Sequence, residues 1–178
     1  MKALLKNRKF AATVAVIVLY LSLVFGTTHS LNKQAQKVEA LFFDGVPDTE
    51  QNYTRPSINS QLQVCADAAN GLITVVEDGA DKDALRAARN ALLDAETVER
   101  KLEAYIKLTL AFMAVSPSAH GAAAEDYVAT FNGAGVYIRV LAADYNAEVS
   151  AYWKTSHALP GLIFGLFANQ PTRIVLPM

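Results

Sequence analysis

An apolar run near the N-terminus stands apart from the rest of the chain. Residues 10–25, FAATVAVIVLYLSLVF, contain only Thr13 and Ser22 as polar residues, and Gly26 to Thr28 extend the run to 19 residues. A bilayer core of about 30 Å requires about 20 helical residues, so the run is long enough to cross a membrane. We therefore expect a basic N-terminus and a transmembrane anchor within residues 1–28.

A cleaved signal peptide is the alternative, and it requires a shorter apolar core followed by small residues at the cleavage site. The sequence VFGTTHS places Val24 and Gly26 at the two key positions, which is a poor match. Apolar residues then continue at helical spacing, at Leu31, Ala35, Val38 and Phe42. This continuity favours an uncleaved anchor whose helix extends through residues 29–43.

The remainder of the pattern predicts a linker and then helices only. Residues 44–56, DGVPDTEQNYTRP, are rich in turn-forming residues and are interpreted as a linker. After Pro56 apolar residues recur every three or four positions, and no segment alternates as a strand does. Ser57 and Thr97 are expected N-caps, and the last long helix should end near Ser156.

Helices that each bury one apolar stripe predict an all-α fold. We expect the N-terminal transmembrane helix to be followed by an antiparallel bundle of about four helices within residues 57–178. The chain can reverse at Gly79, at residues 95–97, or at both. One reversal places the C-terminal end of the bundle near the membrane, whereas two add a fifth helix and place it at the far end.

The C-terminal sequence PGLIFGLFANQP, residues 160–171, is unusually apolar. Gly161 to Ala168 spans only about 12 Å as a helix, which is too short to cross a bilayer. The Gly161–Gly165 spacing indicates helix dimerisation only inside a longer membrane helix. Two interpretations remain, a short lid that folds over the end of the bundle, and an exposed interaction patch. The patch would comprise Leu162, Ile163, Leu166 and Phe167.

Charge is unevenly distributed, although the net charge is only -1. Lys2, Lys6, Arg8 and Lys9 supply four of the 16 basic residues, which leaves 12 basic against 17 acidic residues in the rest of the chain. Basic residues before an anchor favour a cytoplasmic N-terminus, so the bundle is expected to be extracytoplasmic. An acidic excess in the bundle argues against nucleic acid as a partner.

Residues that carry chemistry are sparse. The single cysteine, Cys65, excludes a disulfide framework and is expected to be buried in the core. No histidine has another histidine or a paired glutamate at metal-binding spacing, and no phosphate-binding loop or nucleophile elbow occurs. DGADKDA resembles a calcium loop only faintly and is interpreted as a helix–helix turn. We predict no catalytic residue, no cofactor and no metal site.

The sequence YNAEVSAYWKTSHALPGLIFGLFANQP resembles the C-terminal signature of the LemA family. Trp153, Leu159 and Leu31 depart from that signature, so the chain would be a divergent member. Leu31-Asn32 occupies the place of a further Tyr-Asn pair. The matching positions are Tyr145, Asn146, Val149, Tyr152, Pro160 and Pro171. The resemblance implies an anchored helical bundle of unestablished molecular function, carries no catalytic residue across, and implies an N-terminus outside the cell.

Two functions are compatible with these features. The first is a non-enzymatic interaction or scaffold protein of the cell envelope, held in the membrane by its N-terminal helix and binding a protein partner or a second copy of itself. The alternative is an envelope enzyme, or a bundle that binds a small ligand or metal. The tyrosines at positions 145 and 152 are expected to lie in the core rather than to contact a ligand.

Overall fold

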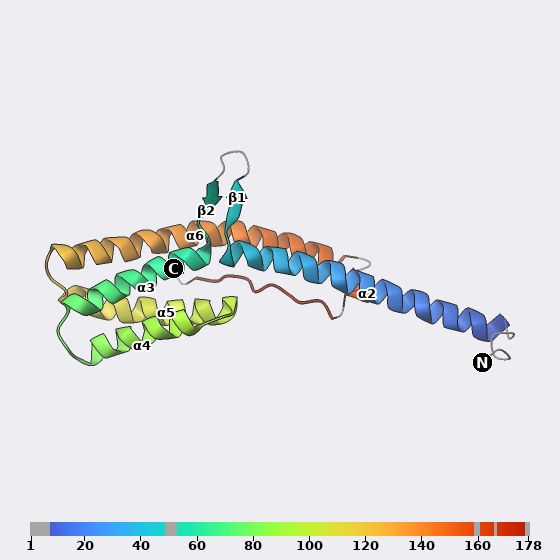
Figure 1. Ribbon diagram of the computed structural model, residues 1–178, viewed down its shortest axis with the longest axis horizontal. Coiled ribbons are helices and arrows are strands. Elements are labelled where there is room, and N and C mark those ends of the chain that lie inside the picture. Colours follow the sequence, from blue (N-terminus) through green and yellow to red (C-terminus); the bar gives the residue numbers. More distant parts are fainter. Residues whose placement is uncertain (1–7, 49–52, 159–160, 166, 177–178) are drawn as a thin grey trace. The chain divides into compact units, whose positions relative to one another are not determined.

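A computed structural model describes residues 8–48, 53–158, 161–165 and 167–176 (Figure 1). The elements in chain order are α2 (Arg8–Phe43), β1 (Val46–Asp48), β2 (Tyr53–Arg55), α3 (Ile58–Val75), α4 (Ala80–Asp94), α5 (Val98–Val115), the 3-10 turn η1 (Ser116–Ser118), α6 (Ala122–Ser156) and α7 (Gly161–Phe164). The predicted fold class is confirmed: a long apolar N-terminal helix precedes an antiparallel helical bundle. A single short hairpin is the one addition within the described residues.

The chain divides into two compact units, and each is described by itself. The first comprises residues 1–37 and 149–171, and the second comprises residues 38–148 and 172–178. The first unit thus combines residues from both ends of the chain, and the second combines the middle of the chain with residues 172–178. The sequence had instead suggested a serial division into anchor, linker and bundle.

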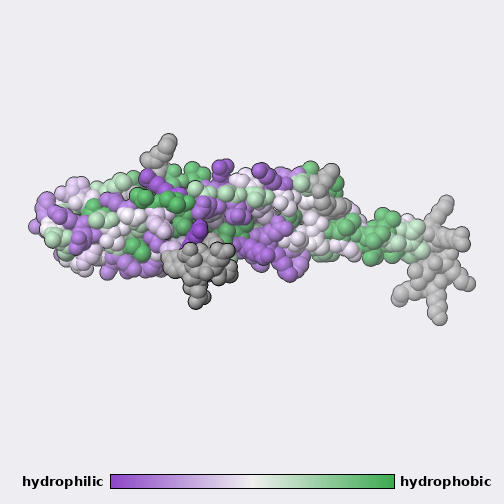
Figure 2. Space-filling model, turned by 90° about the horizontal axis from the view of Figure 1, so that it is seen from above, coloured by the Kyte–Doolittle hydropathy of each residue, from purple (hydrophilic) through white to green (hydrophobic). Residues whose placement is uncertain are grey.

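In the first unit, α2 carries the apolar run. The helix is long and apolar enough to cross a membrane, and no part of its most apolar stretch is buried. Phe25 is 70% exposed, and the run appears almost uniformly hydrophobic (green) in Figure 2. A helix that is apolar on all sides and covered on none is typical of a lipid-facing segment. Further along α2, Leu31 and Ala35 are buried.

In the second unit, α3 to α6 form the bundle, with α4 packed against both α3 and α5. The chain reverses both at residues 76–79 and at residues 95–97, so both of the predicted reversal sites are used. The predicted caps are present. Ser57 Oγ accepts a hydrogen bond from the Ser60 N–H at 2.9 Å, and Thr97 Oγ1 accepts one from the Arg100 N–H at 3.3 Å.

The core of the bundle forms along the apolar stripes that the sequence predicts. Phe112 of α5 and Phe131 of α6 stack with ring centroids 3.9 Å apart, which joins these two helices. Fully or almost fully buried side chains include Ile58, Leu62, Cys65, Leu72, Leu85, Leu92, Leu108 and Ile138.

The predicted linker, residues 44–56, contains a two-stranded antiparallel hairpin in which Val46 pairs with Arg55. Gly45 has a φ of 82°, and a Cβ there would collide with the Arg55 carbonyl oxygen. Three-residue strands are too short to show alternation, so the pattern could not reveal them. The hairpin returns the chain to where it left α2, and α3 continues in the direction in which α2 ends (Figure 1). The sequence-based expectation counted a reversal of the chain at the linker in addition to the two later reversals. The chain does not reverse at the hairpin, so that count does not hold.

Candidate functional site

The C-terminal segment, of which the structure describes residues 161–165 and 167–176, consists of the single turn α7 and of described residues without regular structure after it. Leu162, Ile163 and Phe167 are 55%, 47% and 77% exposed. We call these three residues the apolar patch. The other predicted member, Leu166, and the signature residue Pro160 lie outside the described residues. The three side chains of the apolar patch are therefore exposed, whereas Gly161 and Pro171 are buried.

The two glycines of the segment permit close approach of its backbone to neighbouring groups. A Cβ on Gly161 would lie 2.6 Å from the Ser156 carbonyl oxygen, at the end of α6. A Cβ on Gly165 would lie 2.5 Å from Leu31 Cδ1 on α2 and 2.6 Å from the Gly161 carbonyl oxygen. Real Cβ atoms do not come this close to other atoms, so both positions require glycine. The two glycines, four residues apart, allow the turn to pack closely against its neighbours.

α7 lies beside the part of α2 where the apolar run ends. One groove in the first unit is lined by Gly26, Thr27, Ser30, Leu31 and Gln34 of α2 and by Thr155 and Gly161. Gly26 and Thr27 belong to the last residues of the predicted span. The apolar patch, which starts one residue after Gly161, is therefore held next to the boundary of that span.

The backbone of Asn169 is held at both of its polar groups. Its N–H donates to Asn32 Oδ1 of α2 at 2.7 Å, and its carbonyl accepts from the Tyr152 hydroxyl of α6 at 2.5 Å. Tyr152 itself is 3% exposed. Two signature positions thus anchor an extended backbone that has no secondary structure of its own to satisfy these groups.

In the second unit, Asn146 holds the chain after Pro171 in the same manner. Its Nδ2 donates to the Ile174 carbonyl at 2.8 Å, and its Oδ1 accepts from the Ile174 N–H at 2.9 Å. This reciprocal pair imitates one rung of a β-ladder. The Ile174 side chain is buried, so the tail is fixed by polar contacts and by burial together.

Tyr145 and Val149 are core residues, as predicted. The Tyr145 ring is 2% exposed and meets Phe42 of α2 edge to face, with centroids 6.1 Å apart. Its hydroxyl is buried and has no hydrogen-bond partner among the described residues. Burial, and to a lesser extent the nearby negative charge of Glu39, raises the pKa of Tyr145 to about 12.

Among the signature positions, Tyr145 and Val149 thus lie in the core, and Asn146 and Tyr152 bind the C-terminal segment. Sequence reasoning identified Asn32, Asn146 and Tyr152 by resemblance but could not identify their partners. Those partners are the backbones of Asn169 and Ile174. Backbone N–H and carbonyl groups are the same in almost every residue type, so the sequence cannot indicate which of them a side chain binds. Only the structure reveals these contacts.

Metal-ligating residues do not gather in any part of the chain that the structure describes. No group of three or more His, Cys, Asp or Glu side chains there could hold a metal ion. His157 follows the end of α6, and its Nδ1 lies 2.9 Å from the Trp153 carbonyl oxygen. This contact ties the histidine to the local backbone.

Cys65 is buried in the bundle, as predicted, and its thiol lies 3.9 Å from the Phe131 carbonyl oxygen. Burial raises the pKa of the Cys65 thiol to about 12. The thiolate is the reactive form of cysteine, so this side chain behaves as a small hydrophobe rather than as a nucleophile.

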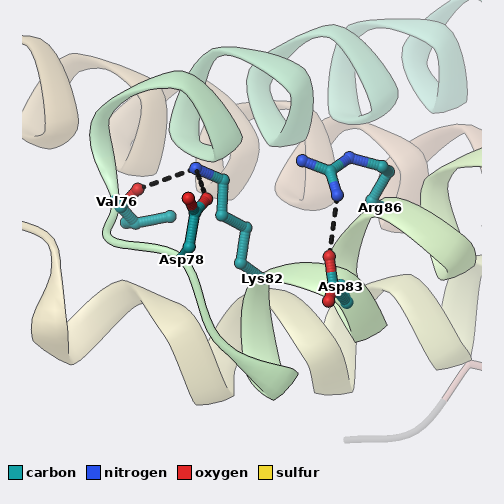
Figure 3. Close-up of polar contacts among 5 residues, drawn as sticks. All are labelled: Val76, Asp78, Lys82, Asp83 and Arg86. Carbon is teal, nitrogen blue, oxygen red and sulfur yellow. Dashed lines mark hydrogen bonds and ion pairs between the residues drawn. The ribbon is translucent and has the colours of Figure 1, made fainter.

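The sequence DGADKDA lies at the predicted turn between α3 and α4, with Asp78 and Gly79 in the turn and the rest in the first residues of α4, and charged groups there stabilise the turn (Figure 3). Lys82 Nζ donates to the Val76 carbonyl at 3.0 Å and lies 2.9 Å from Asp78 Oδ1. Arg86 pairs with Asp83 at 2.7 Å. Lys82 thus satisfies a carbonyl at the C-terminal end of α3, where helices favour cations.

Comparison with known proteins gives no match to this chain among protein families, curated proteins or solved structures.

Proposed function

We propose that this protein is a LemA-like, single-pass membrane protein with a non-enzymatic interaction or scaffold role in the cell envelope. Its N-terminal helix crosses the cell membrane, and its bundle lies on the extracytoplasmic side. The apolar patch rests on the bilayer surface as a second, shallower contact beside the anchor.

One observation carries the membrane contact. Gly161 shares a groove with Gly26 and Thr27, and Gly165 meets Leu31 of the same helix. The patch is thereby positioned where α2 would leave the lipid, and its three side chains are exposed. Apolar side chains beside a polar headgroup region gain free energy by entering the acyl boundary. Lipid is therefore the first partner that this surface would meet.

The polar residues of the signature support a structural role over a catalytic one. Asn32, Asn146 and Tyr152 are all engaged with backbone groups of the C-terminal segment. These residues hold a segment of the chain in place, which is a structural role. The resemblance to the LemA family and the arrangement of these residues thus support the same proposal.

The test uses the full chain in lipid vesicles with a polarity-sensitive fluorophore on Phe167→Cys. We expect blue-shifted emission and quenching by lipid-borne quenchers, because the side chain would lie at the acyl boundary. The matched control is Asp94→Cys, which is exposed in the other unit and should respond to aqueous quenchers only.

A second variant separates the patch from the anchor. The triple substitution Leu162→Ser, Ile163→Ser and Phe167→Ser should leave the chain in the membrane fraction after alkaline extraction, because α2 is intact. It should also leave the helical circular dichroism unchanged. Equal aqueous quenching at Phe167 and Asp94 in the parent chain would refute the membrane contact, and release of the parent chain by alkali would refute the anchor.

A further inference from the structure

Helix α6 has two apolar faces, of which the bundle uses only one. The inward face includes Phe131, Ile138 and Tyr145, all of which are buried. On the opposite face of the helix lies a second series of small or apolar residues, and these are exposed. Seen from the side on which α6 lies, the surface shows hydrophobic groups among polar ones (Figures 1 and 2).

The second series has heptad spacing. Its members are separated by four, three, four, three and four residues, which is the repeat of a coiled-coil seam. Val136 and Val140, at its centre, are 62% and 58% exposed. We call this series the α6 seam, and it comprises Ala129, Gly133, Val136, Val140, Ala143 and Ala147, all exposed.

We propose that the α6 seam pairs with the α6 seam of a second copy of this chain, in parallel, as a two-stranded coiled coil. Isolated exposed apolar residues are common on proteins, but an exposed series at heptad positions over five intervals forms a continuous surface against which a second helix can pack. A second α6 offers that helix with the same spacing.

Charges beside the seam favour self-pairing in the parallel direction. Arg139 and Asp144 are exposed on opposite sides of the seam and are five residues apart. In heptad terms they occupy a g position and the following e position, which meet between the two helices of a parallel dimer. Two-fold symmetry then forms the Arg139–Asp144 pair twice. An antiparallel dimer would instead bring residues of the same kind, such as the two Arg139 side chains, to the same side.

The size of the seam indicates where the dimer should form. From Ala129 to Ala147 the helix rises about 27 Å, and four of the six residues are glycine or alanine. Small residues allow close approach but bury little area, so we expect an interface smaller than the roughly 800 Å² per partner of a standard complex. Confinement by anchors raises the effective concentration and aligns both copies. This part of the inference rests on the proposed anchor, whereas the pairing of the seam does not.

Disulfide cross-linking of the full chain in membranes tests the proposal. Val136→Cys should form a covalent dimer on mild oxidation, because a seam position faces its own counterpart in a parallel pair. Glu148→Cys is the matched control on the same helix, exposed but outside the seam, and should cross-link at least tenfold less. The unmodified chain gives the background, since Cys65 is buried.

Charge reversal provides an independent readout. Arg139→Asp should lower the cross-linking of Val136→Cys severalfold, and adding Asp144→Arg should restore it. Equal cross-linking of Val136→Cys and Glu148→Cys would overturn the proposal. Cross-linking found only in mixtures of Val136→Cys with Val140→Cys would overturn the parallel arrangement, and adducts with another protein alone would overturn self-pairing. Recovery of the chain in the membrane pellet is scored separately, so failure of the anchor is not mistaken for failure of the seam.

Discussion

Two tyrosines on α6, seven residues apart, differ in how their hydroxyl groups are satisfied. The Tyr152 hydroxyl donates to the Asn169 carbonyl, whereas the buried Tyr145 hydroxyl has no partner among the described residues. A buried hydroxyl without a hydrogen bond costs about 1–3 kcal/mol, and a made bond contributes about 1 kcal/mol. The same chemical change should therefore have opposite effects at the two positions.

We predict that Tyr145→Phe raises the free energy of unfolding of the full chain by about 1 kcal/mol, while Tyr152→Phe lowers it by about 1 kcal/mol. Urea unfolding in detergent micelles, followed by circular dichroism, measures both. Each variant serves as the control for the other, since both remove one oxygen from a buried ring. A loss of stability in Tyr145→Phe as large as that in Tyr152→Phe would contradict the prediction.

The raised pKa of Tyr145, about 12, also predicts a dependence of stability on pH. An unfolded tyrosine ionises near pH 10, so the folded chain holds this proton more tightly than the unfolded chain does. The corresponding stabilisation is complete below pH 10 and is lost as the pH rises from 10 to 12. Cys65, whose pKa is raised from 9.0 to about 12, contributes a further loss that begins nearer pH 9 and continues to pH 12.

We expect the free energy of unfolding to fall between pH 10 and pH 12, and to fall less steeply in Tyr145→Phe than in the parent chain. Unfolding at several pH values in this range provides the measurement. Parallel pH profiles for the two proteins would show that Tyr145 ionises as freely in the folded chain as in the unfolded one.

At the scale of elements, two glycines in different surroundings make a matched pair. A Cβ at Gly165 would collide with Leu31 and with the backbone of Gly161, whereas a Cβ at Gly133, inside α6, meets nothing within 4 Å. Gly165→Ala should therefore loosen the C-terminal segment. Gly133→Ala should stabilise α6 by about 0.5–1 kcal/mol, the cost of glycine in a helix.

Amide hydrogen exchange distinguishes these effects. In Gly165→Ala we expect the Asn169 amide, which is bonded to Asn32, to exchange at least tenfold faster, because the turn that positions it is displaced. Gly133→Ala should leave that amide unchanged and raise the unfolding midpoint. Unaltered exchange at Asn169 in Gly165→Ala would mean that Leu31 yields to the added methyl group.

The elements that sequence could predict are those in which local signals agree. Apolar spacing located the long helices, and Ser57 and Thr97 marked two starts because each side chain caps its own helix. The hairpin and the C-terminal segment carry no such signal. The hairpin strands have three residues each, and the segment is held by contacts between a side chain and a distant backbone.

At the scale of the whole molecule, two signals disagree about the orientation of the proposed anchor. Four basic residues precede the apolar run, which favours a cytoplasmic N-terminus, whereas the LemA resemblance implies the opposite. We predict that protease added to intact cells cleaves the bundle. Replacing Lys2, Lys6, Arg8 and Lys9 by Gln should convert a measurable fraction of the chain to the protected orientation.

Lysed cells provide the control, since the bundle is accessible there in either orientation. Full protection of the parent chain in intact cells would place the bundle in the cytoplasm and would change the set of partners open to it. It would leave the proposals for the α6 seam and the apolar patch intact, because neither depends on which side of the membrane the bundle occupies.

The contact between Asn32 and Asn169 joins residues that are 137 positions apart in the chain. At the usual rates of synthesis, about 5–20 residues per second, Asn169 is made on the order of ten seconds after Asn32. Until then the Asn32 Oδ1 lacks the Asn169 N–H that it binds in the folded chain, and Leu31 lacks its contact with Gly165. The contact therefore forms late relative to the synthesis of α2, and a nascent chain that has not yet reached Asn169 exposes this part of α2 to chaperones and proteases.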